Sequence, residues 1–176
     1  MAEQADLDRE EEQQVDDYAN VHTSVIFEAI RREGEHELSR PVSALCWSGV
    51  AAGLALSTSV LAKGFLQSVL PHAEWTPAVT NLGYTVGFLV VILGRMQLFT
   101  ENTITPILTL FLDPSRANFL QTARLWGIVF AANLVGGAAA ALVLVFGDIL
   151  PAARFEGVLT VSRDYGAATP LEHFAW

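Results

Sequence analysis

Long uncharged apolar runs alternate with polar stretches along this chain. The first run, from Val42 to Ala62, contains no charged residue, and a second extends from Leu125 to Gly147. About 20 apolar residues in a helix cross the hydrocarbon core of a bilayer. The pattern therefore predicts an all-α membrane protein with transmembrane helices at residues 41–70 and 125–147.

A third apolar stretch, residues 77–112, has an unusual length for a membrane span. As one helix it would extend roughly 54 Å, at 1.5 Å per residue, which is too long for one crossing. It is also too short for two crossings of about 20 residues each. Two interpretations stay open: a span broken inside the membrane, or a span at 77–94 of about 27 Å followed by an interfacial segment.

The residues between Gly94 and Pro106 favour the broken span, with a loop at about 95–105. Glycine is a weak helix former, and proline cannot donate the hydrogen bond of a helix interior. Pro106 suits the first turn of a new half-helix, for which three residues are candidate caps: Asn102, Thr103 and Thr105. The N-terminus of such a half-helix offers free N–H groups to an anion, as in transporters with broken helices.

Several side chains in and near this loop are candidates for an anion path. Leu98 and Phe99 could form an apolar constriction, while Thr100 and Thr103 add hydroxyl donors. The other polar residues are candidates for a supporting role, since Arg95 and Glu101 could pair with each other or lie at the interface; the set is Arg95, Glu101, Asn102 and Asn133. For Asn133 we favour an interhelical hydrogen bond over a pore position.

Small residues recur every four positions in each predicted span. The stripes are Gly49, Gly53 and Ser57; Gly83 and Gly87; and Ala132, Gly136 and Ala140. Such stripes allow close approach of helix backbones in membranes. We therefore expect a tightly packed bundle.

The segments outside the spans are polar. Of the net charge of −9, the first forty residues carry −8, from twelve acids and four bases. We predict a disordered acidic tail at 1–20, an amphipathic cytoplasmic helix at 21–37 that lies on the membrane or is solvated, and a polar loop at 148–176 approaching a further span. Basic residues before the first span favour a cytoplasmic N-terminus.

Other chemistries find little support in the sequence. The single cysteine, Cys46, cannot form an intrachain disulfide, and His72 with Glu74 is weak evidence for a metal site. No nucleophile–base pair, phosphate loop or strong basic patch occurs. We therefore expect no enzyme activity, no cofactor, no metal and no nucleic-acid partner.

Two segments resemble the formate/nitrite transporter family. GRMQLFTENTITPILTLF, Gly94 to Phe111, is similar to the family's broken second transmembrane segment, and WGIVFAANLVGG, Trp126 to Gly137, to its third. The resemblance covers about residues 35–176. It implies an aquaporin-like fold of two inverted three-helix repeats, a homopentamer in the cell (inner or plasma) membrane, and passage of small monovalent anions such as formate or nitrite, with a proton. Leu98 and Phe99 would then belong to the cytoplasmic-side constriction, and Thr100 would bond to a central pore histidine.

The chain also departs from this family's pattern. It carries three predicted spans where the family has six, so it resembles the first repeat only, and no histidine stands in the context of the family's pore histidine. Glu101 and Asn102 replace the small residues that follow the loop threonine in formate channels. An alternative therefore stands beside transport: a non-transporting truncated membrane fragment or interaction subunit. The nucleotide sequence downstream of Trp176 would reveal a truncated reading of a longer gene.

Overall fold

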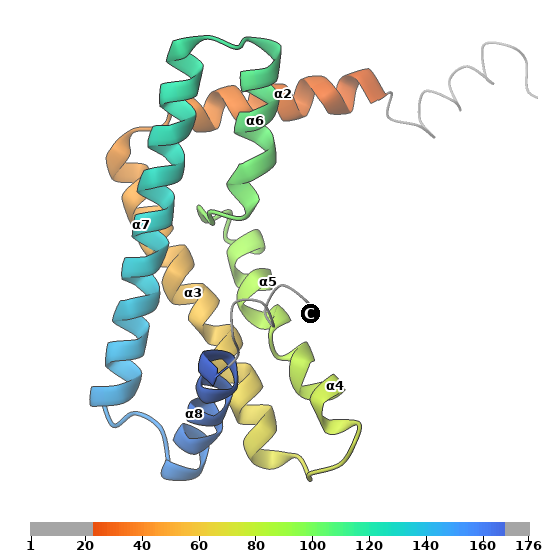
Figure 1. Cartoon of the computed structure of the whole chain (residues 1–176), viewed down its shortest axis with the longest axis vertical. Coiled ribbons are helices and arrows are strands. Elements are labelled where there is room, and N and C mark those ends of the chain that lie inside the picture. Colours follow the sequence, from red (N-terminus) through yellow and green to blue (C-terminus); the bar gives the residue numbers. More distant parts are fainter. Residues whose placement is uncertain (1–22, 168–176) are drawn as a thin grey trace, which may run out of the picture. The chain divides into compact units, whose positions relative to one another are not determined.

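The computed structural model describes residues 23–167, and every regular element among them is helical (Figure 1). In chain order they are α2 (Thr23–Ser39), α3 (Val42–Val69), α4 (Thr76–Leu82), α5 (Thr85–Leu93), the 3-10 turn η1 (Glu101–Thr103), α6 (Ile104–Leu112), α7 (Arg116–Phe146) and α8 (Ala152–Ala167). The helix predicted at 21–37 corresponds to α2, and the tail predicted at 1–20 lies outside the described residues.

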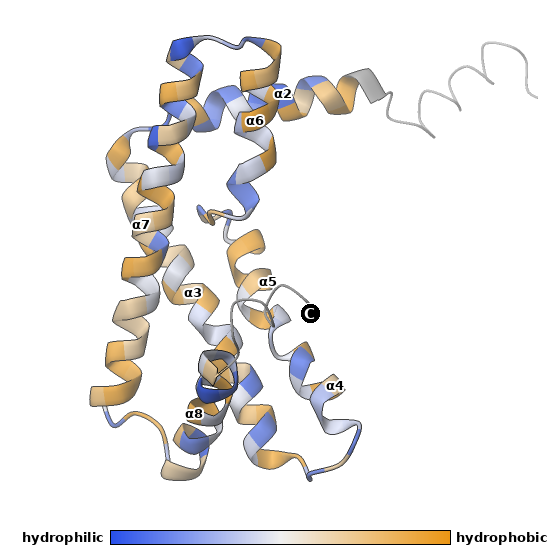
Figure 2. Ribbon diagram, viewed as in Figure 1, coloured by the Kyte–Doolittle hydropathy of each residue, from blue (hydrophilic) through white to orange (hydrophobic). Residues whose placement is uncertain are grey.

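Three stretches of these residues are long and apolar enough to cross a membrane: Val42–Val69, Thr76–Leu93 and Arg116–Phe146. Only 17–28% of the residues in their most apolar windows are buried inside the protein, so most of each apolar surface faces outward. Figure 2 shows this as hydrophobic colour along both sides of α5 and α7. Apolar helices exposed all round are typical of a membrane protein.

Helix α7 begins nine residues before the predicted start of its span. Ser115 explains the difference, because its Oγ accepts the backbone N–H of Asn118 at 3.2 Å as a helix cap. Asn118 in turn donates to the backbone oxygen and carboxylate of Asp113, both at 3.0 Å. These contacts extend the start of α7 by polar turns, which a hydropathy pattern does not detect.

The prediction of a polar loop at 148–176 is wrong, because helix α8 occupies most of this range. Gly157 of α8 and Gly64 of α3 lie against each other's backbones, and Val158 and Val161 are buried. Arg154 stacks over the ring of Phe65 at 4.9 Å. The apolar stripe of α8 is short and flanked by charges, so averaged hydropathy hides the helix.

The described residues form two compact units. One unit comprises α2, α6 and the first turns of α7. Helices α2 and α6 cross at Gly34, where an added Cβ would meet the backbone oxygen of Thr105 and the hydroxyl of Thr109. Glycine is required there because the two helices touch through backbone.

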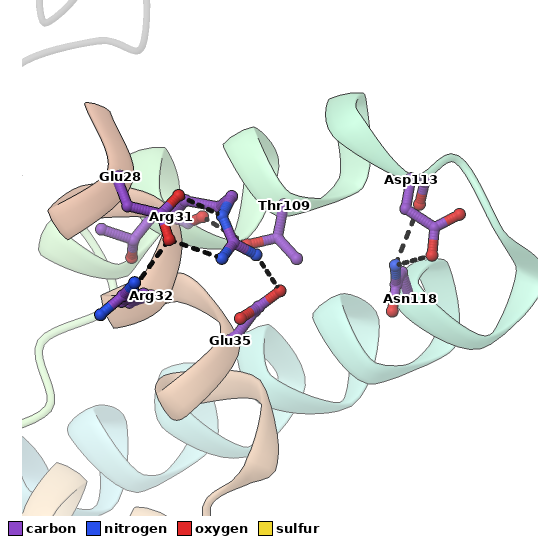
Figure 3. A network of polar contacts seen from close by, with 8 residues as sticks. Glu28, Arg31, Arg32, Glu35, Thr109, Asp113 and Asn118 are labelled. Atoms are coloured by element: carbon purple, nitrogen blue, oxygen red, sulfur yellow. Dashed lines mark hydrogen bonds and ion pairs between the residues drawn. The ribbon is translucent and has the colours of Figure 1, made fainter. Parts of the chain in front are cut away.

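An ion-pair network lies along α2 (Figure 3). Arg31 donates two hydrogen bonds to Glu28, at 2.7 and 2.8 Å, and a further short one to Glu35, while Arg32 donates to Glu28 at 2.8 Å. The hydrogen bonds from Arg31 and Arg32 lower the pKa of Glu28 to about 2. Each pair is spaced three or four residues apart, the spacing at which side chains meet on a helix.

This network predicts an acid-dependent stability difference. Because the pKa of Glu28 is lower in the fold than the ordinary 4.5, its contribution is fully present above about 4.5 and is lost as pH falls toward 2. Thermal unfolding of wild type and Glu28→Gln should therefore differ most above pH 5 and converge toward pH 2. A difference that stays constant across this range would contradict the assignment.

In the second unit, α3 packs against α4, α5 and α8. Glycines also bring α3 against α7, since Gly49 contacts Ala132, and Gly53 and Gly136 face backbone atoms of the opposite helix. The small-residue stripes predicted for the spans are confirmed as helix contacts at these positions. Close backbone approach is what such stripes supply in a membrane.

A second interruption divides the 76–93 span at Gly83 and Tyr84. The backbone there tightens to 3-10 bonds, such as Val86 N–H to the Gly83 oxygen at 3.2 Å. Buried Ser59 of α3 enters the gap, donating to the Tyr84 oxygen at 2.6 Å and accepting the Gly87 N–H at 2.9 Å. A side chain inserted into the hydrogen-bond ladder is a recognised cause of a helix kink.

Candidate functional site

The helix break begins with a left-handed turn at Arg95. Helix α5 is closed by two backbone bonds, from Arg95 N–H to the Ile92 oxygen and from Met96 N–H to the Val91 oxygen, both 3.1 Å. This is a Schellman cap, which usually has glycine at its left-handed position, yet Arg95 stands there with φ of 46°. Met96 completes the cap by packing with Val91 in the apolar core.

The left-handed Arg95 predicts a stabilising substitution. A non-glycine residue in this conformation costs about 1 kcal/mol, so Arg95→Gly should stabilise the fold by roughly that amount. Thermal denaturation in detergent measures it, with Arg95→Ala as the control that removes the charge but keeps the strain. If both variants shift the unfolding temperature equally, the charge and not the backbone is responsible.

Asn133 of α7 holds the loop after this cap. Its Oδ1 accepts the Phe99 N–H at 2.9 Å, and its Nδ2 donates to the backbone oxygens of Gln97 at 2.9 Å and Gly49 at 2.8 Å. One amide therefore joins α7, α3 and the loop. The interhelical hydrogen bond expected of Asn133 is present, and two loop bonds accompany it.

A second set of polar contacts fixes the ends of the loop. Gln97 N–H donates to the hydroxyl of Ser48 at 3.0 Å, and the Asn102 amide donates to the Gln97 side-chain oxygen at 2.6 Å. Trp126 donates its indole N–H to the Asn102 oxygen at 2.8 Å. Gln97 and Asn102 are 4% and 8% exposed, and the hydrogen bond between their side-chain amides pairs these two buried polar groups.

The predicted constriction residues take different positions. Leu98 is 4% exposed and packs in the apolar cluster with Ala52, Ala55 and Val91. Phe99 is half-buried, with its ring edge-on to Phe130 at 5.3 Å and to Trp126 at 6.2 Å.

The two threonines predicted for the anion path lie in the turn that precedes α6. Thr100 is exposed, and Thr103 is half-buried and donates to the Thr100 oxygen at 3.0 Å. Thr105, considered as a helix cap, is the second residue of α6 instead.

The two charged residues of the segment do not pair. Arg95 and Glu101 are both exposed, and within residues 23–167 neither forms an ion pair. The structure therefore brings together Phe99, Asn102 and Asn133, while Arg95 and Glu101 stand apart.

Sequence reasoning missed three residues of the site. Ser48 and Gln97 were not considered, and Trp126 was named only as part of the segment that resembles the family. A signal existed for Gln97, an uncharged polar residue in an apolar stretch, which in a membrane usually has a hydrogen-bond partner. Ser48 and Trp126 act on the loop from 49 and 24 residues away, which no local pattern reveals.

Potential metal ligands are found elsewhere. Among the described residues, the only group of three close enough to share an ion is Glu33, His36 and Glu37 on α2. His72 and Glu74 line a cavity of about 460 Å³ beside Lys63 and Asp164. Neither set includes a residue of the loop.

Comparison with known proteins now decides the family. The family model described as "Formate/nitrite transporter" matches residues 24–175, most of the chain and all of the loop described above. The chain belongs to the formate/nitrite transporter family. This is a family of channels and transporters and not of enzymes, and membership supports anion transport in general.

Two curated proteins show similarity to this member of the family. The "Inner membrane protein YfdC" of Escherichia coli is 41% identical over 150 residues, which cover 85% of this chain and 48% of that protein. The "Formate channel FocA" of Haemophilus influenzae is 28% identical over 116 residues, covering 65% of this chain and 40% of the channel. The chain thus spans about half the length of the curated relatives it matches. No solved structure matches it.

Proposed function

We propose that this protein takes part in moving small monovalent anions of the formate or nitrite type across a membrane. Family membership supports anion transport, and three apolar helices support a membrane location. The observation that carries the proposal is the ordered break between α5 and α6. A nonhelical segment at membrane depth is tolerated only when it is buried in protein or lines a water-filled path.

Hydrogen bonds to Ser48 of α3 and Asn133 of α7 hold the loop at this break in place, which makes it a candidate constriction. Leu98 packs in the apolar core, the Phe99 ring makes edge-on contacts with two aromatic rings, and Thr100 is exposed. We propose that Leu98, Phe99, Thr100 and Thr103 form one wall of the anion path. Asn102 and Asn133 hold that wall in place through their hydrogen bonds.

The assembly and placement of the protein are parts of the same proposal. The family resemblance implies a homopentamer in the cell (inner or plasma) membrane, with proton-coupled or channel-like passage. The arginines that precede α3 support a cytoplasmic N-terminus. Cross-linking in native membranes should then yield a ladder ending at five copies.

Uptake into proteoliposomes tests the transport proposal. The purified protein should accumulate labelled formate or nitrite faster at acidic than at neutral external pH, while empty liposomes do not. Gly137→Ala, at a position with open space around it, serves as a folded control that should retain the wild-type rate. A well-folded protein that moves no small monovalent anion would refute the proposal.

A further inference from the structure

Helix α2 divides its four acidic residues between two clusters. Two of them, Glu28 and Glu35, belong to the ion-pair network described above. Glu33 and Glu37 lie one turn apart on a different side of the helix, beside His36. Residues three and four positions apart meet on a helix surface, so these three side chains form a second cluster, outside the network.

The second cluster brings three metal-ligating atoms together. One imidazole nitrogen of His36 and one carboxylate oxygen each of Glu33 and Glu37 lie within 4.8 Å of one another. Within residues 23–167, the side chains of Glu33 and His36 form no hydrogen bond or ion pair, and both are exposed to an incoming ion. Glu37 is 7% exposed, and low exposure strengthens the attraction of a carboxylate for a cation because water screens it less.

We propose that Glu33, His36 and Glu37 bind a divalent transition-metal ion, with Zn²⁺ as the best match. Imidazole and carboxylate groups bind zinc at about 2.0–2.2 Å, and three protein ligands leave a fourth position for water. A glutamate followed three residues later by a histidine also supplies two metal ligands in helical bundles. The cluster shares no residue with the loop between α5 and α6, so this inference goes beyond the proposed transport and does not depend on it.

The charge and the ligand types of the cluster both favour such an ion. Two carboxylates within 4.8 Å of each other repel, and a divalent cation offsets their charge. The imidazole discriminates among cations, because it suits zinc, copper and nickel, whereas Mg²⁺ and Ca²⁺ take oxygen ligands. Ligands bound tetrahedrally at about 2.1 Å lie about 3.4 Å apart, so small side-chain rotations bring the three atoms onto one ion.

Calorimetric titration with Zn²⁺ tests the site in the full chain, purified in detergent without an affinity tag and treated with a chelator. Removing a ligand costs at least as much affinity as removing one of its outer-sphere partners, about tenfold to a hundredfold. The Kd for Zn²⁺ should therefore rise about tenfold or more in His36→Ala and in Glu33→Gln, and both exposed positions tolerate substitution. His72→Ala and Glu74→Gln are matched controls at an exposed pair outside the cluster, and both should keep the wild-type Kd.

A cobalt spectrum tests the histidine as a direct ligand. In a Cys46→Ala background, His36→Cys replaces the imidazole by a thiolate, which also binds transition metals. Co²⁺ added to this variant should produce a thiolate-to-cobalt charge-transfer band that excess Mg²⁺ does not remove. His72→Cys in the same background should show no such band.

The outcomes separate this site from the transport function. A Kd that His36→Ala leaves unchanged, or that His72→Ala raises equally, would overturn the assignment. A cobalt band of equal strength at both cysteines, or at neither, would do the same. Formate uptake is measured separately, and its presence or absence bears only on the transport proposal.

Discussion

Replacing Asn133 by leucine is expected to destabilise the protein by about 2–4 kcal/mol and to abolish ordered packing of the loop. The substitution keeps an apolar helix surface but leaves two backbone groups without partners, the Phe99 N–H and the Gln97 oxygen, and it removes the additional bond to the Gly49 oxygen inside α3. Leaving such groups unpaired costs more than the bonds themselves contribute. Unfolding in detergent by chemical titration measures the loss.

Leu134→Ala is the matched control for this substitution. Leu134 is the next residue of α7 and is 58% exposed, so its truncation should change stability by less than about 0.5 kcal/mol. Asn133→Asp adds a diagnostic, since a carboxylate can still accept the Phe99 N–H but cannot donate to the two carbonyls. An Asn133→Leu protein as stable as Leu134→Ala would show that the amide does not hold the loop.

Gly136→Ala should destabilise the helix pair α3–α7 by about 1–3 kcal/mol, whereas Gly137→Ala should be neutral or slightly stabilising. A methyl group at Gly136 would press into the backbone oxygen of Val50, with the Gly53 Cα and the Leu54 nitrogen 3.0 Å away. A methyl group at Gly137 has no neighbour within 4 Å. Backbone cannot rotate aside as a flexible side chain can, so the helices must separate.

The adjacent glycines make this pair a sharp test of packing. Both variants gain the same helix propensity, and therefore their difference in unfolding temperature reports the contact alone. Loss of helix contact should also expose the 126–137 segment to proteolysis in Gly136→Ala. Equal stability of the two variants would mean that α3 and α7 do not pack at Gly136.

Local sequence patterns could predict the spans but not the loop contacts. The runs at 42–62 and 125–147 are uncharged and largely apolar, so length and hydropathy suffice to predict the spans formed by α3 and α7. The break after Gly94 was predicted from glycine, proline and excess length, which are local properties. Its exact form was not, because the cap at Arg95 puts an arginine where a glycine is usual.

Contacts between distant segments account for what the sequence could not predict. Ser59 inserts into a helix 25 residues away and creates the Gly83 interruption, and Ser48 meets the loop 49 residues on. Neither serine differs locally from the many that bond to their own helix, such as Ser57 to the Gly53 oxygen. Helix α8 was missed for a related reason. The burial of its Val158 and Val161 depends on packing against α3, where Val158 contacts Gly64, and a local pattern does not reveal such a contact.

The central claim is that the break between α5 and α6 lies on a water-filled anion path, and cysteine accessibility tests it most directly. Cys46, the single native cysteine, is first replaced by alanine, and Thr100→Cys and Leu134→Cys are compared in membranes. A negatively charged, water-soluble thiol reagent should modify the cysteine at 100, formate should slow that reaction, and the cysteine at 134 should stay unmodified. An unreactive cysteine at 100, or a reaction that formate does not slow, would contradict the account.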